Sequence, residues 1–406
     1  MRRVHARTDA VFHFVSGNTP VVVECSAAVH PQGNRSFPLN DVSSENKTAA
    51  DEHDDDRVVL DSTFACSNTD DSPVEQTSQS ADGNRMPLVF RLLIYGLLII
   101  GVQIGVGIVA AVGCLIYFIS NGSIDSLDNV NELEQLLQND LVLVTALTAL
   151  PLALLTMGVS YFCRRYLDRR NWKTMGFVGC QWTGVAGIPM GMFLGILPIL
   201  LAAAFVWLAG GFTFERIDVS FLTIVMVPTL VLMAFTEEIM FRGYMLQNFV
   251  DDNRSSAGIL LSSVVFWLVH GLNPGAWDSP IIAVNLFGAG IILAQAYLLS
   301  GNIWFPTVLH FGWNFAQGVM LSIPVSGLRF PGVVRLSPVA DASHWLTGGN
   351  FGLEGSALVT LFEIAMIVFF FYSIKSTDTD ANAGSYSEQS SCPKSLTSKG
   401  CHVPEQ

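Results

Sequence analysis

Long apolar runs fill the sequence after residue 91, and they constrain the fold more than any other feature. Because lipid offers no hydrogen bonds to the backbone, a segment that crosses a bilayer must be a helix of about 20 residues. Eight runs approach this length, and the fifth and sixth nearly abut. They cover residues 92–119, 141–163, 185–211, 222–248, 257–276, 280–299, 303–323 and 355–374. The sequence therefore predicts an all-α, polytopic integral membrane protein with about eight transmembrane helices.

The composition agrees with a protein whose main partner is the lipid bilayer. Half of the 406 residues are hydrophobic and only 14% are charged, whereas an average soluble domain is about 25% charged. The net charge is −13 and there is no basic patch, which argues against a nucleic-acid partner. The seven cysteines show no C-x-x-C spacing, so we interpret them as ordinary thiols.

Polar segments flank the apolar region at both ends. Residues 1–86 are rich in Ser, Asn, Asp, Thr and Gln and contain the acidic run DEHDDD, a composition typical of disorder. Residues 376–406 form a polar, Ser/Thr-rich stretch. We expect three parts: a disordered acidic N-terminal extension (1–86), a membrane domain (87–375) and a disordered C-terminal tail (376–406).

The distribution of basic residues predicts the orientation. The segment after the second run reads RRYLDRRNWK, whereas residues 120–140 contain no Lys or Arg. Because Lys and Arg accumulate in cytoplasmic loops, both termini are predicted to be cytoplasmic.

The first polar cluster within an apolar run is FTEEIMFRGY, which contains Glu237, Glu238 and Arg242. Glu238 and Arg242 are four residues apart, so they share a helix face and can form an ion pair. Glu237 is turned about 100° away and is left free to act as a general base. A buried ion pair that only fixes packing is the alternative, but two carboxylates with one arginine leave a surplus negative charge.

Two further clusters supply histidines and an amide. FWLVHG places Phe266 and His270 four apart, and LHFGWNF places His310 and Asn314 four apart. Either histidine alone is explained by helix–helix hydrogen bonding. Together the clusters predict a hydrolytic site in which Glu237 and His270 hold a water molecule opposite an oxyanion site of His310 and Asn314.

Depth in the membrane tests this hypothesis. If the fourth helix stopped at Phe241, Glu237 and His270 would differ in depth by more than about 10 Å, at 1.5 Å per residue. A helix that continues through YMLQNFV places Glu237 at mid-membrane. The catalytic interpretation therefore requires a long fourth helix.

At these clusters the chain resembles the CPBP family of intramembrane proteases, which includes CAAX prenyl endopeptidases and bacteriocin-processing (Abi) proteins. The family pattern E-E-x-x-x-R, F-x-x-x-H and H-x-x-x-N is matched by Glu237-Glu238-Ile-Met-Phe-Arg242, Phe266-Trp-Leu-Val-His270 and His310-Phe-Gly-Trp-Asn314. The resemblance covers about residues 230–320. The flanks FRGYMLQ and HGLNP look like bacterial members, which implies a bacterial cytoplasmic (inner) membrane.

The resemblance implies an intramembrane endopeptidase that acts on membrane-bound peptides or proteins. Glu237 would activate water, with His270 helping to hold it, while His310 and Asn314 would stabilise the oxyanion. Glu238 and Arg242 would orient these groups. The family has been described both as metalloproteases and as metal-free glutamate proteases, so a divalent metal such as Zn²⁺ stays an open cofactor. The substrate is equally open between prenylated CAAX proteins and a leader or bacteriocin-like peptide.

Two other functions fit the same residues. A non-catalytic peptide-binding protein for self-immunity against a bacteriocin needs the same pocket. A transporter would use Glu237, Glu238 and Glu363 as a proton path. By itself Glu363 suggests a structural hydrogen bond within the eighth helix, and Glu354 is expected to be an exposed loop residue.

Overall fold

A computed structural model describes residues 7–16, 19–28, 85–120, 130–177 and 187–390. Two units separate at residue 65. The first contains an antiparallel hairpin of β1 (Arg7–Ser16) and β2 (Thr19–Ala28), which pairs Arg7 with Ala28. Residues 29–84 and 391–406, where disorder is predicted, lie outside the described residues, so that prediction is untested there.

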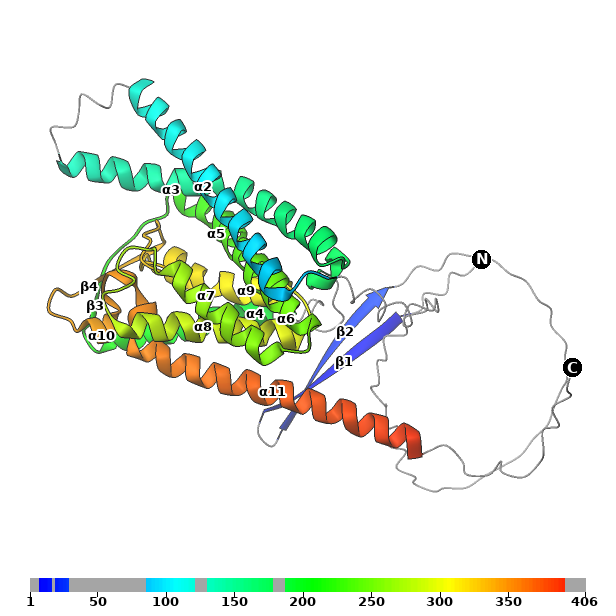
Figure 1. The fold of residues 1–406 in the computed structure, drawn as a ribbon. Coiled ribbons are helices and arrows are strands. Elements are labelled where there is room, and N and C mark those ends of the chain that lie inside the picture. The colour runs from blue at the N-terminus through cyan, green and yellow to red at the C-terminus, as the bar shows by residue number, and fades with distance from the viewer. Residues whose placement is uncertain (1–6, 17–18, 29–84, 121–129, 178–186, 391–406) are drawn as a thin grey trace, which may run out of the picture. The chain divides into compact units, whose positions relative to one another are not determined.

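The second unit is a helical bundle (Figure 1). Its long helices are α2 (Leu88–Ser120), α3 (Val130–Phe162), α4 (Gly187–Leu208), α5 (Phe221–Glu238), α7 (Ser255–His270), α8 (Pro280–Ser300), α9 (Trp304–Asn314) and α11 (Ala357–Ser390). Short π-helical segments extend three of them, namely η3 (Cys163–Leu167), η5 (Ile239–Leu246) and η6 (Phe315–Met320). The last segment of the fourth run is α6 (Gln247–Asp251).

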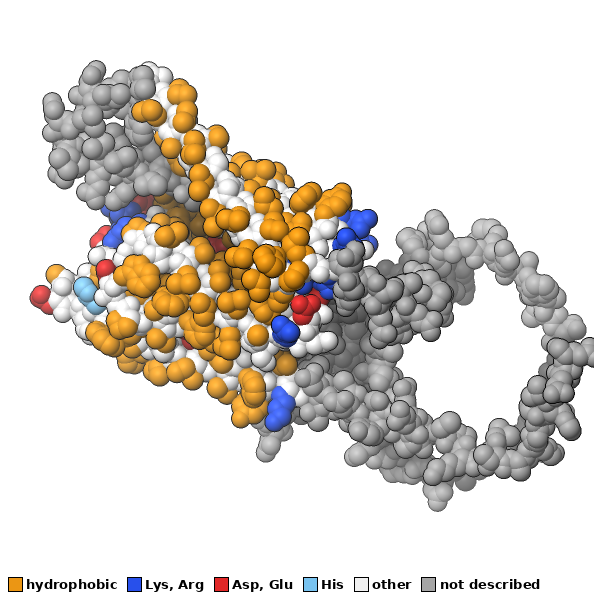
Figure 2. Space-filling model, viewed as in Figure 1, with side chains coloured by type: hydrophobic (Ala, Val, Ile, Leu, Met, Phe, Trp, Pro, Cys, Tyr) orange, Lys and Arg blue, Asp and Glu red, His pale blue; other side chains and the backbone are white. Residues whose placement is uncertain are grey.

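Helices occupy all eight predicted runs, and the all-α membrane fold is confirmed. Within the described ranges, six helices are long and apolar enough to cross a membrane. The fifth and seventh runs form shorter helices than predicted. α7 ends at His270 because Gly271, Asn273, Pro274 and Gly275 follow it, and these are turn residues. Figure 2 shows hydrophobic side chains over the middle of the bundle and charged ones gathered toward its ends.

The fourth run forms the long helix that the catalytic hypothesis requires. α5, η5 and α6 follow one another without a break from Phe221 to Asp251. The π-helical turns begin directly after Glu238, and such bulges are frequent at functional sites.

Two glycines allow α4 and α9 to approach closely. A Cβ atom on Gly195 would lie 2.2 Å from the carbonyl oxygen of Leu309, and one on Gly312 would lie 3.1 Å from that of Met192. Backbones can touch in this way only where side chains are missing. The contact fixes α9, which carries His310 and Asn314.

Ion pairs join the ends of α2, α3 and α6. Arg91 lies 3.1 Å from Asp168, which follows η3, and 3.4 Å from Asp252. Arg164 lies 2.8 Å from Asp251. These contacts place the three helix ends on one side of the bundle, in agreement with the distribution of basic residues. Which side of the membrane they face stays a prediction.

A small antiparallel sheet lies at the other end of α5. Its strands are β3 (Phe212–Ile217), just before α5, and β4 (Val334–Pro338). The loop between η6 and β4 contributes Ser326 to the site described next, and the helical turn η8 (Leu353–Gly355), which follows η7 (Gly349–Phe351), contributes Glu354.

Candidate functional site

Glu238 connects two of the three clusters. Its Oε1 atom accepts hydrogen bonds from Nη1 of Arg242 and from Nδ1 of His310, both at 2.9 Å. Both Glu238 and Arg242 are completely buried. The predicted ion pair is therefore present, and its carboxylate also fixes the ring of His310.

Arg242 makes further contacts that the sequence did not indicate. Its Nη2 atom donates a 3.1 Å hydrogen bond to the carbonyl of Gly290 in α8. Its guanidinium carbon lies 4.9 Å from the centre of the Phe266 ring, within the range of a cation–π interaction. Arg242 thus links η5 to α7 and α8, which explains one use of the phenylalanine in the second cluster.

Glu237 faces both histidines. Its Oε2 atom lies 3.7 Å from Nε2 of His270 and 3.9 Å from Nε2 of His310. This oxygen is buried and accepts no hydrogen bond from the described residues, although the side chain as a whole is 22% exposed. The three predicted clusters therefore meet at one carboxylate oxygen.

Hydrogen bonds at Nδ1 determine which tautomer each histidine adopts. Nδ1 of His270 lies 2.8 Å from the carbonyl oxygen of Phe266, and Nδ1 of His310 lies beside the Glu238 carboxylate. Both oxygens only accept, so Nδ1 donates in each ring. In the neutral state, both Nε2 atoms are then lone-pair acceptors directed toward Glu237.

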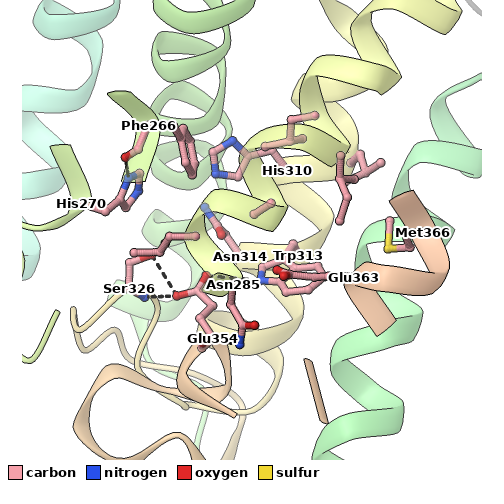
Figure 3. Close-up of a pocket in the computed structure, with 15 residues that line it drawn as sticks. Phe266, His270, Asn285, His310, Trp313, Asn314, Ser326, Glu354, Glu363 and Met366 are labelled. Carbon is pink, nitrogen blue, oxygen red and sulfur yellow. Dashed lines mark hydrogen bonds between the residues drawn. The ribbon is translucent and has the colours of Figure 1, made fainter. Parts of the chain in front are cut away.

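A cavity extends from the two histidines into the bundle (Figure 3). Asn314 lies in its wall, is buried, and forms no side-chain hydrogen bond with the described residues. Its amide is therefore available to a ligand. The remaining wall is largely apolar and comes from α8, α9 and α11, including Leu286, Ala289, Leu293, Leu309 and Met366.

Glu354 lines the same cavity, which corrects its expected place in an exposed loop. Its Oε1 atom accepts a 3.2 Å hydrogen bond from Trp313, and its Oε2 atom accepts bonds from the amide and the hydroxyl of Ser326 at 2.5 and 2.9 Å. Only 7% of Glu354 is exposed. Burial raises the pKa of its carboxyl, while the Ser326 bonds act in the opposite direction.

The glycines around Glu354 explain how a loop carboxylate enters the bundle. Gly352 has φ +97°, and a Cβ atom there would lie 1.9 Å from the carbonyl oxygen of Pro324. Only glycine permits both this backbone conformation and such a close approach. The glycine-rich segment LTGGNFGLEGS therefore turns Glu354 toward the cavity, and the cluster of glycines was the signal for it in the sequence.

Glu363 of α11 is the second unexpected carboxylate in the wall. It is 3% exposed and makes no hydrogen bond to a described residue, which corrects the expected structural hydrogen bond. An acidic residue within an apolar run was itself a signal of function. Ser326, Trp313 and Asn285, which also line the cavity, had no distinguishing signal in the sequence.

Carboxylate and imidazole groups are suitable zinc ligands by type. Among the described residues, no group of three or more His, Cys, Asp or Glu side chains is positioned to hold a metal ion.

Residues 219–316, about a quarter of the chain, match the family model described as type II CAAX prenyl endopeptidase, Rce1-like. The match spans all three clusters, from Glu237 to Asn314. The chain contains a CPBP-family intramembrane protease domain. Searches of curated proteins and of solved structures returned no match.

The CPBP domain thus coincides with the elements that build the site. It begins just before α5 and ends just after α9, so it includes every residue that the sequence nominated for catalysis. Glu354 and Glu363, by contrast, reach the cavity from beyond the matched region. The family match supports intramembrane endopeptidase activity in general.

Proposed function

We propose that the protein is an intramembrane endopeptidase in which Glu237 activates the attacking water. The observation that carries this proposal is the convergence of Nε2 of His270 and Nε2 of His310 on the unpartnered Oε2 of Glu237, at 3.7 and 3.9 Å. A water molecule placed between them would donate one hydrogen bond to Oε2 of Glu237 and one to Nε2 of His270.

The reaction needs one proton acceptor and one oxyanion site. Glu237 takes a proton from the water as its oxygen attacks the carbonyl carbon of the peptide bond, and His270 holds the water through Nε2. Glu237 then gives the proton to the departing amine when the C–N bond breaks. His310, present as the imidazolium before the water attacks, and Asn314 donate hydrogen bonds to the negatively charged oxygen of the intermediate.

Glu238 and Arg242 act as positioning residues in this mechanism. The bond from Nδ1 of His310 to Glu238 holds the ring and favours its protonated form, because a carboxylate stabilises an adjacent imidazolium. Arg242 holds the Glu238 carboxylate in place through a contact of 2.9 Å. Neither side chain needs to contact the substrate.

The substrate reaches the site from the membrane. The site lies within a bundle whose outer surface is apolar. We therefore expect the substrate to be a peptide tethered to the bilayer. We propose a leader or bacteriocin-like peptide, or a prenylated CAAX protein, and a bacterial inner membrane with both termini in the cytoplasm.

Cleavage by the purified protein in liposomes tests the proposal. A fluorogenic prenylated CAAX peptide is compared with a panel of membrane-tethered peptides, using wild type and Glu237→Ala, each with and without a chelator. We expect cleavage by wild type alone. A metal bound at the site would polarise the carbonyl and acidify water, and loss of cleavage with chelator would show that one takes part. Peptide binding without any cleavage would contradict the proposal and favour the immunity function.

A further inference from the structure

The cavity beside the histidines contains more carboxylates than hydrolysis requires. Glu354 and Glu363 line the cavity together with His270 and His310, and Glu237 and Glu238 lie beside those two histidines. Figure 3 shows Glu354 on the far side of the cavity from the histidines and Glu363 reaching in from α11. Neither acid has a part in the proposed mechanism.

Glu354 and Glu363 differ in their surroundings. Glu354 accepts three hydrogen bonds, from Trp313 and Ser326. Glu363 accepts none from the described residues, although only 3% of its surface is exposed.

The backbone of α8 makes room for this carboxylate. A Cβ atom on Gly288 would lie 2.5 Å from Oε2 of Glu363 and 3.3 Å from its carboxyl carbon. Glu363 therefore rests directly on the helix at a glycine. Any larger residue at position 288 would push the carboxylate out of this place.

Among the described residues that line the cavity, the bases are His270 and His310, both of which face Glu237. The residues that line the cavity include no Lys or Arg, and Arg242 is engaged by Glu238 and by the carbonyl of Gly290. Burying a carboxylate without a partner is costly. Burial also raises the pKa of the Glu354 carboxyl, while its hydrogen bonds to Ser326 lower it. A cation that enters the cavity would stabilise both carboxylates.

We propose that Glu363 and Glu354 form a subsite for a basic side chain of the peptide substrate, close to the bond that is cleaved. The inference rests on the proposed endopeptidase function and specifies its substrate. The apolar wall, which includes Leu286, Ala289 and Leu293, suits the methylene stem of a lysine. The carboxylates suit its ammonium group.

The same features disfavour other occupants. A C-terminal carboxylate would be repelled by two acids in a space of low polarity. A purely hydrocarbon group would leave Glu363 without a partner. The site therefore selects a side chain that is apolar along its length and positive at its end.

A lysine scan of the substrate tests the subsite. Membrane-tethered peptides carry either lysine or norleucine, which has the same stem without the charge, at each position from three residues before to three residues after the cleaved bond. We expect one position at which wild type prefers lysine by about tenfold in kcat/KM. The preference should fall to near one in Glu363→Gln and persist in Glu215→Gln, a matched loss of charge on the exposed strand β3.

Binding provides a readout that does not depend on catalysis. Fluorescence anisotropy of labelled peptides on the Glu237→Gln variant should show lysine peptides binding about tenfold more tightly than norleucine peptides, and adding Glu363→Gln should remove the difference. If no peptide is cleaved, the proposed function fails while this measurement still decides the subsite. Glu363→Met serves as a second uncharged variant if Glu363→Gln does not fold.

Three results would overturn the subsite. They are the absence of a lysine preference at every position, a preference that survives in both Glu363→Gln and Glu363→Met, and equal binding of the two peptide series. Any of them would indicate that Glu363 is a neutral acid with a purely structural place in the bundle.

Discussion

Replacing Glu238 by glutamine should destabilise the bundle far more than the loss of an ordinary ion pair. The carboxylate accepts charge-assisted bonds from Arg242 and His310, each at 2.9 Å, and both Glu238 and Arg242 are completely buried. After the change, the guanidinium keeps one strong contact, to the carbonyl of Gly290, and its charge is left uncompensated.

The magnitude follows from these contacts. Hydrogen bonds to charged groups contribute about 1.5–3 kcal/mol each, and removing one partner of a buried ion pair costs about 3–5 kcal/mol. Because the glutamine oxygen still accepts two weaker bonds, we expect a loss of about 3 kcal/mol in the free energy of unfolding. The double variant Glu238→Gln/Arg242→Met removes both partners, so it should lose less than the sum of the two single variants.

Equilibrium unfolding in mixed micelles of a mild detergent and SDS, followed by tryptophan fluorescence, measures this loss. Glu215→Gln is the control, because Glu215 is exposed and surface substitutions change stability by about 0.5 kcal/mol or less. A loss below about 1 kcal/mol for Glu238→Gln would be the value of a solvent-exposed pair. Such a small loss would refute the claim that the buried contacts of Glu238 with Arg242 and His310 hold the His310 ring in place.

Three further variants and one matched control test the oxyanion site, the held water and the packing of α4 against α9. Asn314→Ala should lower kcat by about 10²–10³-fold with little change in KM, because it removes an oxyanion donor, and steady-state kinetics check this. His270→Gln should lower kcat by about 10²–10⁴-fold in the same assay, and unaltered turnover would exclude a role in holding water. Gly195→Ala should destabilise the bundle by about 1–3 kcal/mol, because its Cβ atom would meet the carbonyl oxygen of Leu309 at 2.2 Å. Gly158→Ala should be neutral or stabilising in the same unfolding measurement, because a Cβ atom on Gly158 would meet no other atom within 4 Å.

The sequence predicted the membrane fold and the position of the site because both depend on local patterns. Apolar runs identify helices wherever a bilayer replaces water, and polar residues within such runs are rare enough to stand out. The i, i+4 spacing of Glu238 and Arg242 was sufficient to predict their ion pair. The need for a long fourth helix followed from depth alone, and the continuous helix from Phe221 to Asp251 confirms it.

Contacts between distant segments could not be predicted in this way. An apolar run does not show where turn residues end a helix, so the predicted fifth helix continues past His270 through the Asn273–Pro274–Gly275 turn. The inward path of Glu354 depends on the meeting of two loops at Gly352, which no periodicity reveals. Glu363 was visible as an isolated acid, but only the folded bundle shows that it lines the cavity.

Hydrolysis in H₂¹⁸O by the purified protein tests the central claim most directly. Wild type in liposomes should release a peptide whose new carboxylate carries one ¹⁸O atom, detected by mass spectrometry, since the attacking oxygen comes from water. Glu237→Gln, which preserves the shape of the side chain but cannot accept the proton, should yield no labelled product. Labelled product from Glu237→Gln at the wild-type rate would contradict the assignment of Glu237 as the group that activates water.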